Sequence, residues 1–355
     1  MIQPVGRYSV RVLGRTVQDG GMLWMVSSLS EIGFRIGGAR YLKMILRSDD
    51  SVKDPARENQ RPRYAVLVET DVVMDHRMEQ EEETITVFES STPWGTEVRF
   101  RKLSECTQSL LAVQEIQTDG WIEPLEEQGT RIEFIGDSIT CGYGVEGKNG
   151  QETFTTATEN AGKSYAGLIT DWMGCMSMLT CFSGHGIVSG YTDDPEKRNV
   201  SELVPPYYEK VGRNGFELPS GRTVTEISWD FSAWQPEKIL INLGTNDLSW
   251  CQEREPRKEM YMKQYKEFLK TVRKNNPGAM ILCVLGIMGT GLNEYMVHAV
   301  NEYRAETGDT RIHSMTLQEQ DAARDGYGSD FHPNEITQRL LAGEVTDVIR
   351  KWMKQ

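Results

Sequence analysis

A serine stands where an apolar run of the chain gives way to polar residues. Ile132 to Ile135 read as a strand, Gly136 turns the chain, and Ser138 follows where a helix can begin. Ligands of open α/β sheets bind outside the carboxyl ends of the strands, and backbone N–H groups at a helix start can stabilise an oxyanion. We therefore predict a nucleophilic hydroxyl, although a serine that only caps a helix would give the same pattern.

Two further apolar runs end in groups that could donate hydrogen bonds to an oxyanion. Gly184 follows the run from Met176 to Phe182, and a glycine lets a backbone N–H approach a ligand closely. Asn246 follows the run from Lys238 to Leu243 and can offer its side-chain amide. Losing one such donor typically lowers kcat about 10²–10³-fold. Both positions could instead be simple turns, and His185 is expected to line the site or cap its turn.

A histidine precedes the last helical pattern of the chain. Pro333 suits the first turn of a helix, which places His332 on the loop before it. An imidazole titrates near neutrality and is the natural base for a serine hydroxyl. Asp330 is close enough in sequence to orient that imidazole if the loop folds back. A surface histidine at a helix start would explain a lone His-Pro pair equally well, but together with the serine and the two donors this histidine completes the set that acyl transfer requires.

Composition limits the possible partners. The formal net charge of −13 disfavours nucleic acid, because phosphate contacts need clustered Lys and Arg. The five histidines form neither HExxH nor a Cys/His cluster, so we expect no metal site.

The sequence also bears on the compartment of the protein. The six cysteines lack a CxxC pair, so we expect reduced thiols. No apolar run approaches the roughly 18 residues of a membrane span, so we expect no membrane segment. The N-terminus lacks a secretory pattern, which predicts a cytoplasmic protein unless a leader has been removed.

Two kinds of element must position these residues. Residues 1–125 contain many short strand-like runs separated by turn signals, which predicts an all-β sandwich, jelly-roll-like in form. A polar link spans 117–130, and we place the domain boundary near 126. In 126–355, apolar runs alternate with helical patterns, which predicts a three-layer α/β domain with a parallel sheet. Its five expected strands are Ile132 to Ile135, Met176 to Phe182, Lys238 to Leu243, Met280 to Leu285 and Arg311 to Met315. A C-terminal helix should dock through Ile336, Leu340, Val345, Val348 and Trp352.

The ordered motifs resemble the SGNH (GDSL-type) hydrolases. That family has Gly-Asp-Ser, then Gly, then Gly-x-Asn-Asp, then His before the last helix. Here the pattern reads Gly136-Asp137-Ser138, Gly184, Gly244-Thr245-Asn246-Asp247 and His332. The resemblance implies Ser138 as nucleophile, His332 as base and an oxyanion hole formed by Ser138, Gly184 and Asn246.

A narrower resemblance is to carbohydrate esterase family 2. The runs FIGDSITCGYGVEG, INLGTND and LGIMG, and the order of a β domain before an SGNH domain, are similar to that family. It implies removal of acetyl groups from polysaccharides or oligosaccharides such as xylan and glucomannan, without a cofactor. The wider SGNH pattern has Asp three residues before His, where this chain has Ser329. Asp330 stands two before, so either its carboxylate or a backbone carbonyl orients His332.

Aromatic residues are candidates for stacking on sugar rings. Trp250 is expected to form one wall of the site, with Trp229 and Tyr208 as further candidates beside His185. Their alternative role is core packing. Two other functions stay open: a lipid or aryl esterase on the same scaffold, with an apolar acyl channel, and a non-catalytic carbohydrate-binding protein. The retained Ser138, Asn246 and His332 argue against the latter. The sequence carries no signal for a particular oligomeric state.

Overall fold

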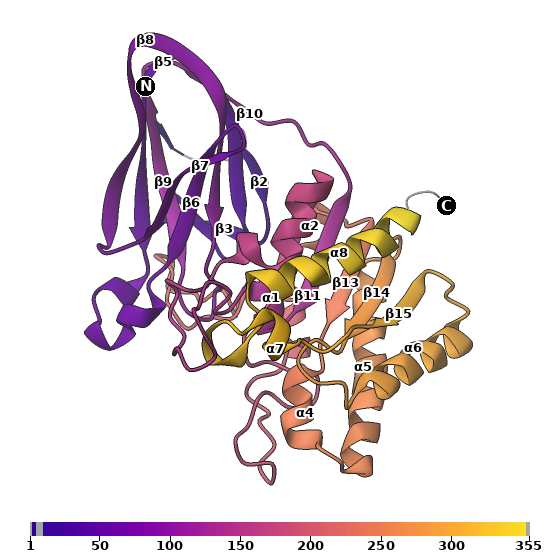
Figure 1. The fold of residues 1–355 in the computed structure, drawn as a ribbon. Coiled ribbons are helices and arrows are strands. Elements are labelled where there is room, and N and C mark those ends of the chain that lie inside the picture. Colours follow the sequence, from indigo (N-terminus) through magenta and orange to yellow (C-terminus); the bar gives the residue numbers. More distant parts are fainter. Residues whose placement is uncertain (1, 5–9, 353–355) are drawn as a thin grey trace.

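The computed structural model describes residues 2–4 and 10–352 (Figure 1). Its first half is a ten-stranded sheet of antiparallel pairs, in the order β3-β4-β9-β5-β8-β6-β7, with β1 on β9 and with β2 and β10 on β5. The strands are β1 Ile2–Pro4, β2 Arg11–Leu13, β3 Thr16–Asp19, β4 Met22–Met25, β5 Glu31–Ser48, β6 Arg63–Val68, β7 Asp71–Arg77, β8 Glu82–Lys102, β9 Leu111–Thr118 and β10 Trp121–Pro124. The short 3₁₀ helices η1 Asp50–Val52 and η2 Pro55–Gln60 join β5 to β6.

This sheet is curled, and it encloses an apolar core. Figure 1 shows the long strands β5 and β8 curving over together. Their register shifts between Ile36 and Ala39, where Gly38 has φ of 65°, and such a bulge bends a strand. Phe34 and Phe100 are fully buried in this core. The predicted all-β N-terminal part is confirmed.

A five-stranded parallel sheet follows, in the order β12-β11-β13-β14-β15. All five predicted strands are present, as β11 Arg131–Gly136, β12 Met176–Cys181, β13 Lys238–Asn242, β14 Met280–Leu285 and β15 Ile312–Thr316. The helices are α1 Ser138–Cys141, α2 Tyr165–Met173, α3 Pro205–Tyr208, α4 Thr245–Cys251, α5 Glu255–Asn275, α6 Asn293–Thr307, α7 Ala322–Asp325 and α8 Glu335–Trp352. The 3₁₀ helices are η3 Ala161–Lys163, η4 Phe231–Ala233 and η5 Ser329–Phe331. None of the helices in the described ranges is long and apolar enough to cross a membrane.

Helices cover both faces of the parallel sheet, which gives the predicted three layers. Helices α5 and α6 pack on one face, where Tyr265 and Phe268 meet Ile239. Helices α2 and α8 pack on the other face. The predicted face of α8 is partly wrong, because Ile336 and Leu340 are 53% and 46% exposed. Val345 makes the contact as predicted, with Val348 and Trp352 partly buried against the same cluster. Leu341, Ala342 and Ile349 complete the covered face in place of Ile336 and Leu340.

The two sheets share one apolar cluster where they meet. Trp24 and Leu110 from the N-terminal part lie in the same cluster as Ile135 and Ile239 of the parallel sheet. Arg15 and Glu133, both buried, form an ion pair across the junction at 3.1 Å. The strands of the first sheet end at Pro124, and those of the parallel sheet begin at Arg131. The apolar core nevertheless includes residues from both parts. The domain boundary near residue 126 therefore stays a prediction.

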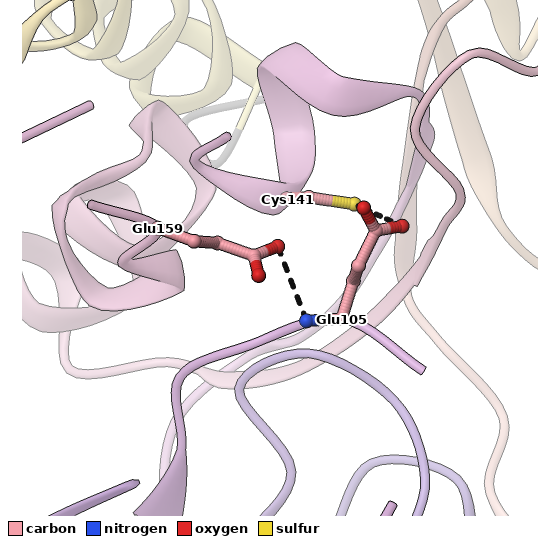
Figure 2. Close-up of side chains that lie close together, drawn as sticks. All are labelled: Glu105, Cys141 and Glu159. Atoms are coloured by element: carbon pink, nitrogen blue, oxygen red, sulfur yellow. Dashed lines mark hydrogen bonds between the residues drawn. The ribbon is translucent and has the colours of Figure 1, made fainter. Parts of the chain in front are cut away.

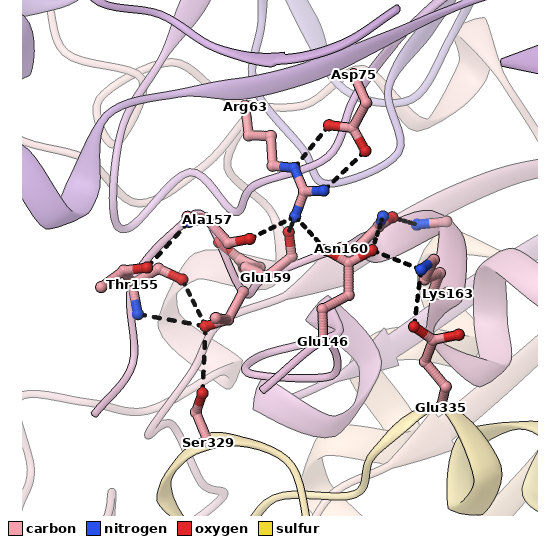
Figure 3. A network of polar contacts seen from close by, with 12 residues as sticks. Arg63, Asp75, Glu146, Thr155, Ala157, Glu159, Asn160, Lys163, Ser329 and Glu335 are labelled. Atoms are coloured by element: carbon pink, nitrogen blue, oxygen red, sulfur yellow. Dashed lines mark hydrogen bonds and ion pairs between the residues drawn. The ribbon is translucent and has the colours of Figure 1, made fainter. Parts of the chain in front are cut away.

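Arg63 of β6 holds the segment after α1 against the N-terminal sheet. Figure 3 shows its guanidinium between the Asp75 and Glu146 carboxylates, at 2.7 and 2.6 Å. It also donates to the backbone carbonyls of Ala157 and Glu159, at 2.9 and 3.0 Å. A planar guanidinium can satisfy several acceptors in fixed directions. The segment that follows the predicted nucleophile is therefore positioned from the other half of the molecule.

Candidate active site

Ser138 lies at the start of α1, directly after strand β11. Asp137 caps the helix by accepting from the N–H of Ile139 at 3.0 Å. Gly136 makes the turn possible, because a Cβ there would lie 2.0 Å from Thr140 Oγ1. The serine is 5% exposed. The predicted strand, turn and helix start are therefore present, and they place the hydroxyl at the carboxyl edge of the sheet.

His332 meets Ser138 across the site. Its Nε2 lies 2.9 Å from Ser138 Oγ, and its Nδ1 lies 3.0 Å from the backbone carbonyl oxygen of Asp330. A carbonyl oxygen can only accept, so Nδ1 carries the proton and the Nε2 lone pair faces the hydroxyl. Burial lowers the pKa of His332, although the Asp330 carbonyl and carboxylate oppose the shift. The imidazole is therefore neutral at pH 7 and can accept the serine proton.

The Asp330 carboxylate is not the group that orients the His332 imidazole, although this was one of the two alternatives expected from the sequence. It accepts from Tyr143 Oη at 2.9 Å and from the Phe154 N–H at 3.1 Å, while the backbone carbonyl meets the imidazole. The reason is the turn at η5, where Asp330 has φ of 48° and Phe331 has φ of 61°. This left-handed backbone aims the carbonyl at the ring and the carboxylate away from Nδ1. Of the two alternatives, it is the backbone carbonyl of Asp330 that contacts His332 Nδ1 in the structure.

The remaining donors come from the neighbouring strand ends. Gly184 follows β12 with φ of 76°, and Asn246 lies in the first turn of α4, after β13. Asn246 Nδ2 donates to the His185 carbonyl at 2.9 Å and lies 3.4 Å from Asp137 Oδ2. Within the described ranges, the backbone N–H groups of Ser138 and Gly184 have no acceptor. Because β12, β11 and β13 are adjacent, the three predicted oxyanion donors come to the same sheet edge.

Buried carboxylates support this edge. Asp247 accepts from the N–H groups of Ile187, Val188 and Ser189, at 3.0, 2.6 and 3.0 Å. Burial raises the pKa of Asp247 to about 6 and that of Asp137 to about 7. The Asp of the Gly-x-Asn-Asp motif thus fixes the loop that follows Gly184.

The predicted sugar-stacking residues lie in the interior. Tyr208 is fully buried and donates to Glu133 at 3.2 Å. Trp250 is 7% exposed, with the Arg257 guanidinium 4.5 Å from its ring centroid. The connection between β12 and β13 carries Tyr208, and it packs into the shared core. The expectation that Tyr208 forms part of a sugar-binding wall is therefore wrong, and its core-packing alternative holds. The expectation that Trp250 forms a wall of the site stays a prediction.

His185 caps its turn, which is one of its two expected roles, whereas Trp229 lies apart from Ser138 and His332. His185 is 1% exposed, its Nδ1 lies 2.7 Å from the Ser183 carbonyl, and burial lowers its pKa to about 4. Its backbone carbonyl, rather than its ring, serves the site by holding Asn246. Trp229 lines a separate cavity of about 380 Å³ that neither Ser138 nor His332 lines. The burial of the His185 ring and the place of Trp229 come from tertiary packing, which residue type does not reveal.

Three aromatic residues that the sequence analysis did not single out surround the histidine. The Tyr143 ring lies 4.3 Å from the His332 ring and stacks on Phe154 at 3.8 Å. Phe331, next to His332, is 48% exposed and packs over Gly150, where a Cβ would lie 2.5 Å from its ring. The glycines that flank Tyr143 were the available signal of close packing beside Ser138, because a Cβ at Gly142 would lie 2.3 Å from the Asn160 carbonyl oxygen and one at Gly144 would lie 2.7 Å from Ser329 Cβ.

One group of side chains has the donor types of a metal site. Glu105, Cys141 and Glu159 are fully buried, and their potential ligand atoms lie within 4.8 Å of one another (Figure 2). In the part of the chain that the structure describes, none of the three side chains is hydrogen-bonded to Ser138 or His332. The catalytic geometry is therefore complete without this group acting directly.

Comparison with known proteins agrees with the geometry. The GDSL-like lipase/acylhydrolase family matches residues 134–340. The cellulase/esterase CelE of Acetivibrio thermocellus is 34% identical over 233 residues, which are 64% of this chain and 26% of that protein. An acetylxylan esterase/glucomannan deacetylase of Cellvibrio japonicus is 27% identical over 223 residues, which are 63% of this chain and 57% of that protein. The chain thus spans about a quarter of the first relative and just over half of the second.

The fold extends over nearly the whole of a solved structure. A family two carbohydrate esterase from Clostridium thermocellum, in complex with cellohexaose, superposes with a TM-score of 0.81 at 24% identity, covering 97% of this chain and 99% of that one. The order of a curled antiparallel sheet before a parallel-sheet hydrolase domain is therefore that of family 2 carbohydrate esterases, as the sequence resemblance implied.

Proposed function

The chain belongs to the GDSL-like lipase/acylhydrolase family, and on that basis we propose that it is a serine esterase that removes acetyl groups from plant polysaccharides or their oligosaccharides. One observation carries the proposal: the 2.9 Å contact between Ser138 Oγ and His332 Nε2, with Nδ1 fixed on the Asp330 carbonyl. The names of CelE and of the Cellvibrio acetylxylan esterase/glucomannan deacetylase support an acetylated glycan as substrate.

The reaction proceeds in two steps on these residues. His332 Nε2 takes the Ser138 proton while Oγ attacks the acetyl carbonyl carbon. The carbonyl oxygen becomes an oxyanion, which the N–H groups of Ser138 and Gly184 and the Asn246 amide stabilise. When the tetrahedral intermediate collapses, the sugar oxygen leaves with the proton from His332, and an acetyl-Ser138 ester remains. His332 then activates a water molecule that releases acetate by the reverse path.

The Asp330 carbonyl has a defined part in this cycle. It keeps the proton on Nδ1, so that Nε2 is always the nitrogen that faces Ser138. When the imidazole becomes a cation, the carbonyl dipole and the Asp330 carboxylate both stabilise the new charge. The proposed steps draw on side chains, backbone and water alone.

Acetate release from acetylated xylan and glucomannan oligosaccharides tests the proposal. Ser138→Ala should lower kcat by about 10⁶, because the nucleophile is lost. Ser28→Ala is the matched control, since Ser28 is 2% exposed and its hydroxyl has no partner. A Ser138→Ala enzyme that kept a tenth of the wild-type turnover would overturn the mechanism.

Nitrophenyl esters of butyrate and octanoate distinguish the remaining functions. Preference for octanoate with no activity on either glycan would replace the proposal with a lipid or aryl esterase. Saturable glycan binding without acetate release would replace it with a binding protein. The cytoplasmic location stays a prediction.

A further inference from the structure

The segment between β8 and β9 reaches from the N-terminal sheet to the carboxyl edge of the parallel sheet. The Leu103 carbonyl accepts from the Ala161 N–H at 3.0 Å, and the Cys106 carbonyl accepts from Asn214 Nδ2 at 2.6 Å. Glu105 stands between these two anchors and is fully buried. Its backbone and its neighbours are thus fixed from both sides by loops of the hydrolase domain.

The Glu105 carboxylate touches the two segments that carry the backbone oxyanion donors. Its Oε2 accepts from the Ser183 N–H at 2.8 Å and from the Cys141 thiol at 3.6 Å. Ser183 directly precedes Gly184, and Cys141 ends the one-turn helix that Ser138 begins. Figure 2 shows the carboxylate of Glu105 lying against Cys141.

Glu159 closes the cluster from the opposite side. Its Oε1 accepts from the Glu105 N–H at 3.1 Å. Burial, and then the neighbouring Glu105, raise the pKa of Glu159 well above its usual value. Burial also raises the pKa of the Cys141 thiol, which therefore stays a donor.

The loop that bears Gly184 depends on hydrogen bonds from neighbouring side chains to keep its shape. Gly184 has φ of 76°, and the loop is fixed after it by Asn246, which binds the His185 carbonyl at 2.9 Å. In the described ranges, the Glu105 carboxylate supplies the hydrogen bond that fixes the Ser183 N–H, just before Gly184.

We propose that Glu105 is a positioning residue for the oxyanion hole: its carboxylate holds Ser183 and Cys141, and so aims the Gly184 and Ser138 N–H groups at the reacting carbonyl oxygen. The N-terminal sheet thereby becomes part of the catalytic apparatus. This inference rests on the proposed function and deepens it.

The test compares Glu105→Gln and Glu105→Ala with Glu133→Gln. Glu133 is equally buried and lies at the same junction, but it contacts Arg15, Thr180 and Tyr208 instead of the oxyanion loop. Glu105→Ala should lower kcat about 10–100-fold, less than the full loss of an oxyanion donor. Glu105→Gln keeps one acceptor oxygen but replaces the other with an NH₂ group, and it should lose about 10-fold. KM should stay within about twofold, because ground-state binding does not use the oxyanion hole.

Two readouts separate positioning from loss of stability. The Ki of methylboronic acid, whose tetrahedral adduct with Ser138 occupies the oxyanion hole, should rise by the same factor as kcat falls. Glu133→Gln should lower the melting temperature while kcat and Ki stay at wild-type values. If Glu105→Gln does not fold, Glu105→Asp replaces it and should show the same paired loss. Equal kcat for wild type and the folded Glu105 variants, or equal losses in Glu133→Gln, would overturn the inference.

A fluorophosphonate ester distinguishes failure of this inference from failure of the proposed function. Ser138 attacks its phosphorus, fluoride leaves, and His332 takes the serine proton, so the rate reports the nucleophile and the oxyanion hole without any sugar. If wild type is labelled but releases no acetate from glycans, the proposed substrate is wrong, and slower labelling of Glu105→Ala still supports the positioning role. Labelling of that variant at the wild-type rate refutes the role.

Discussion

Asp330→Asn separates two ways in which Asp330 could assist His332. If the carboxylate oriented the imidazole, the amide would favour the wrong tautomer and lower kcat about 10⁴-fold. In this structure the backbone carbonyl contacts Nδ1, and the carboxylate accepts from Tyr143 and Phe154. Asparagine keeps the backbone carbonyl and an acceptor in the side chain. It also tolerates the left-handed conformation, since φ is 48° at this position.

The expected fall in kcat for Asp330→Asn comes only from the lost negative charge of the carboxylate. The carboxylate raises the pKa of His332 against the lowering effect of burial, so its charge also stabilises the imidazolium that forms in the transition state. Two charges 4 Å apart near a protein surface interact by about 4 kcal/mol. Asp330 does not contact the ring with its carboxylate and is partly exposed, so we expect about 1–2 kcal/mol, which is roughly 5–30-fold in kcat.

The assay is kcat and kcat/KM for acetate release over a pH series. Asp330→Asn should also move the acid limb of kcat/KM to lower pH, because the imidazolium loses a stabilising charge. Asp321→Asn is the matched control, since Asp321 caps α7 and an asparagine caps equally well. A loss of 10⁴-fold in Asp330→Asn, or an unchanged pH profile, would refute the reasoning.

Two further predictions follow from the same geometry. The wild-type kcat/KM should rise with pH as His332 loses its proton, with a midpoint below 6.5, because burial lowers the pKa of His332 from that value; a midpoint above 7 in a pH–rate profile would contradict this assignment. Phe331→Ala should raise KM for acetylated oligosaccharides about threefold to tenfold with little change in kcat, since Phe331 is 48% exposed beside His332 and an aromatic face contributes about 1 kcal/mol. Trp172→Ala, which removes a 40% exposed ring from the outer side of α2, is the control, and an equal rise of KM in both would contradict a local role for Phe331.

The chain order of strands and polar residues was enough to identify the chemistry. Ser138, Gly184 and Asn246 each follow an apolar run, and parallel strands bring their carboxyl ends to one edge of a sheet. His332 was identifiable because Pro333 marks the start of the last helical segment. These inferences depend on local patterns, which fix the backbone direction at each strand end.

Burial could not be predicted from residue type. Tyr208 is of a residue type that stacks on sugar rings, but the packing of the two sheets against each other buries it completely. Likewise, Leu340 and Leu341 fit the periodicity of α8 almost equally well, and the exact rotation of the helix on the sheet decides which of them is covered.

The sequence alone predicted the two kinds of sheet, and it singled out Ser138, His332, Gly184 and Asn246, which the structure brings together at one sheet edge, because each depends on a short local pattern. Only the tertiary structure decided that the Asp330 carbonyl, rather than its carboxylate, meets His332, since this depends on the left-handed backbone at Asp330 and Phe331. It also decided that Glu105 reaches the oxyanion loop from the N-terminal half. Contacts between residues 78 positions apart arise from how the two sheets pack, and no local pattern of the sequence encodes them.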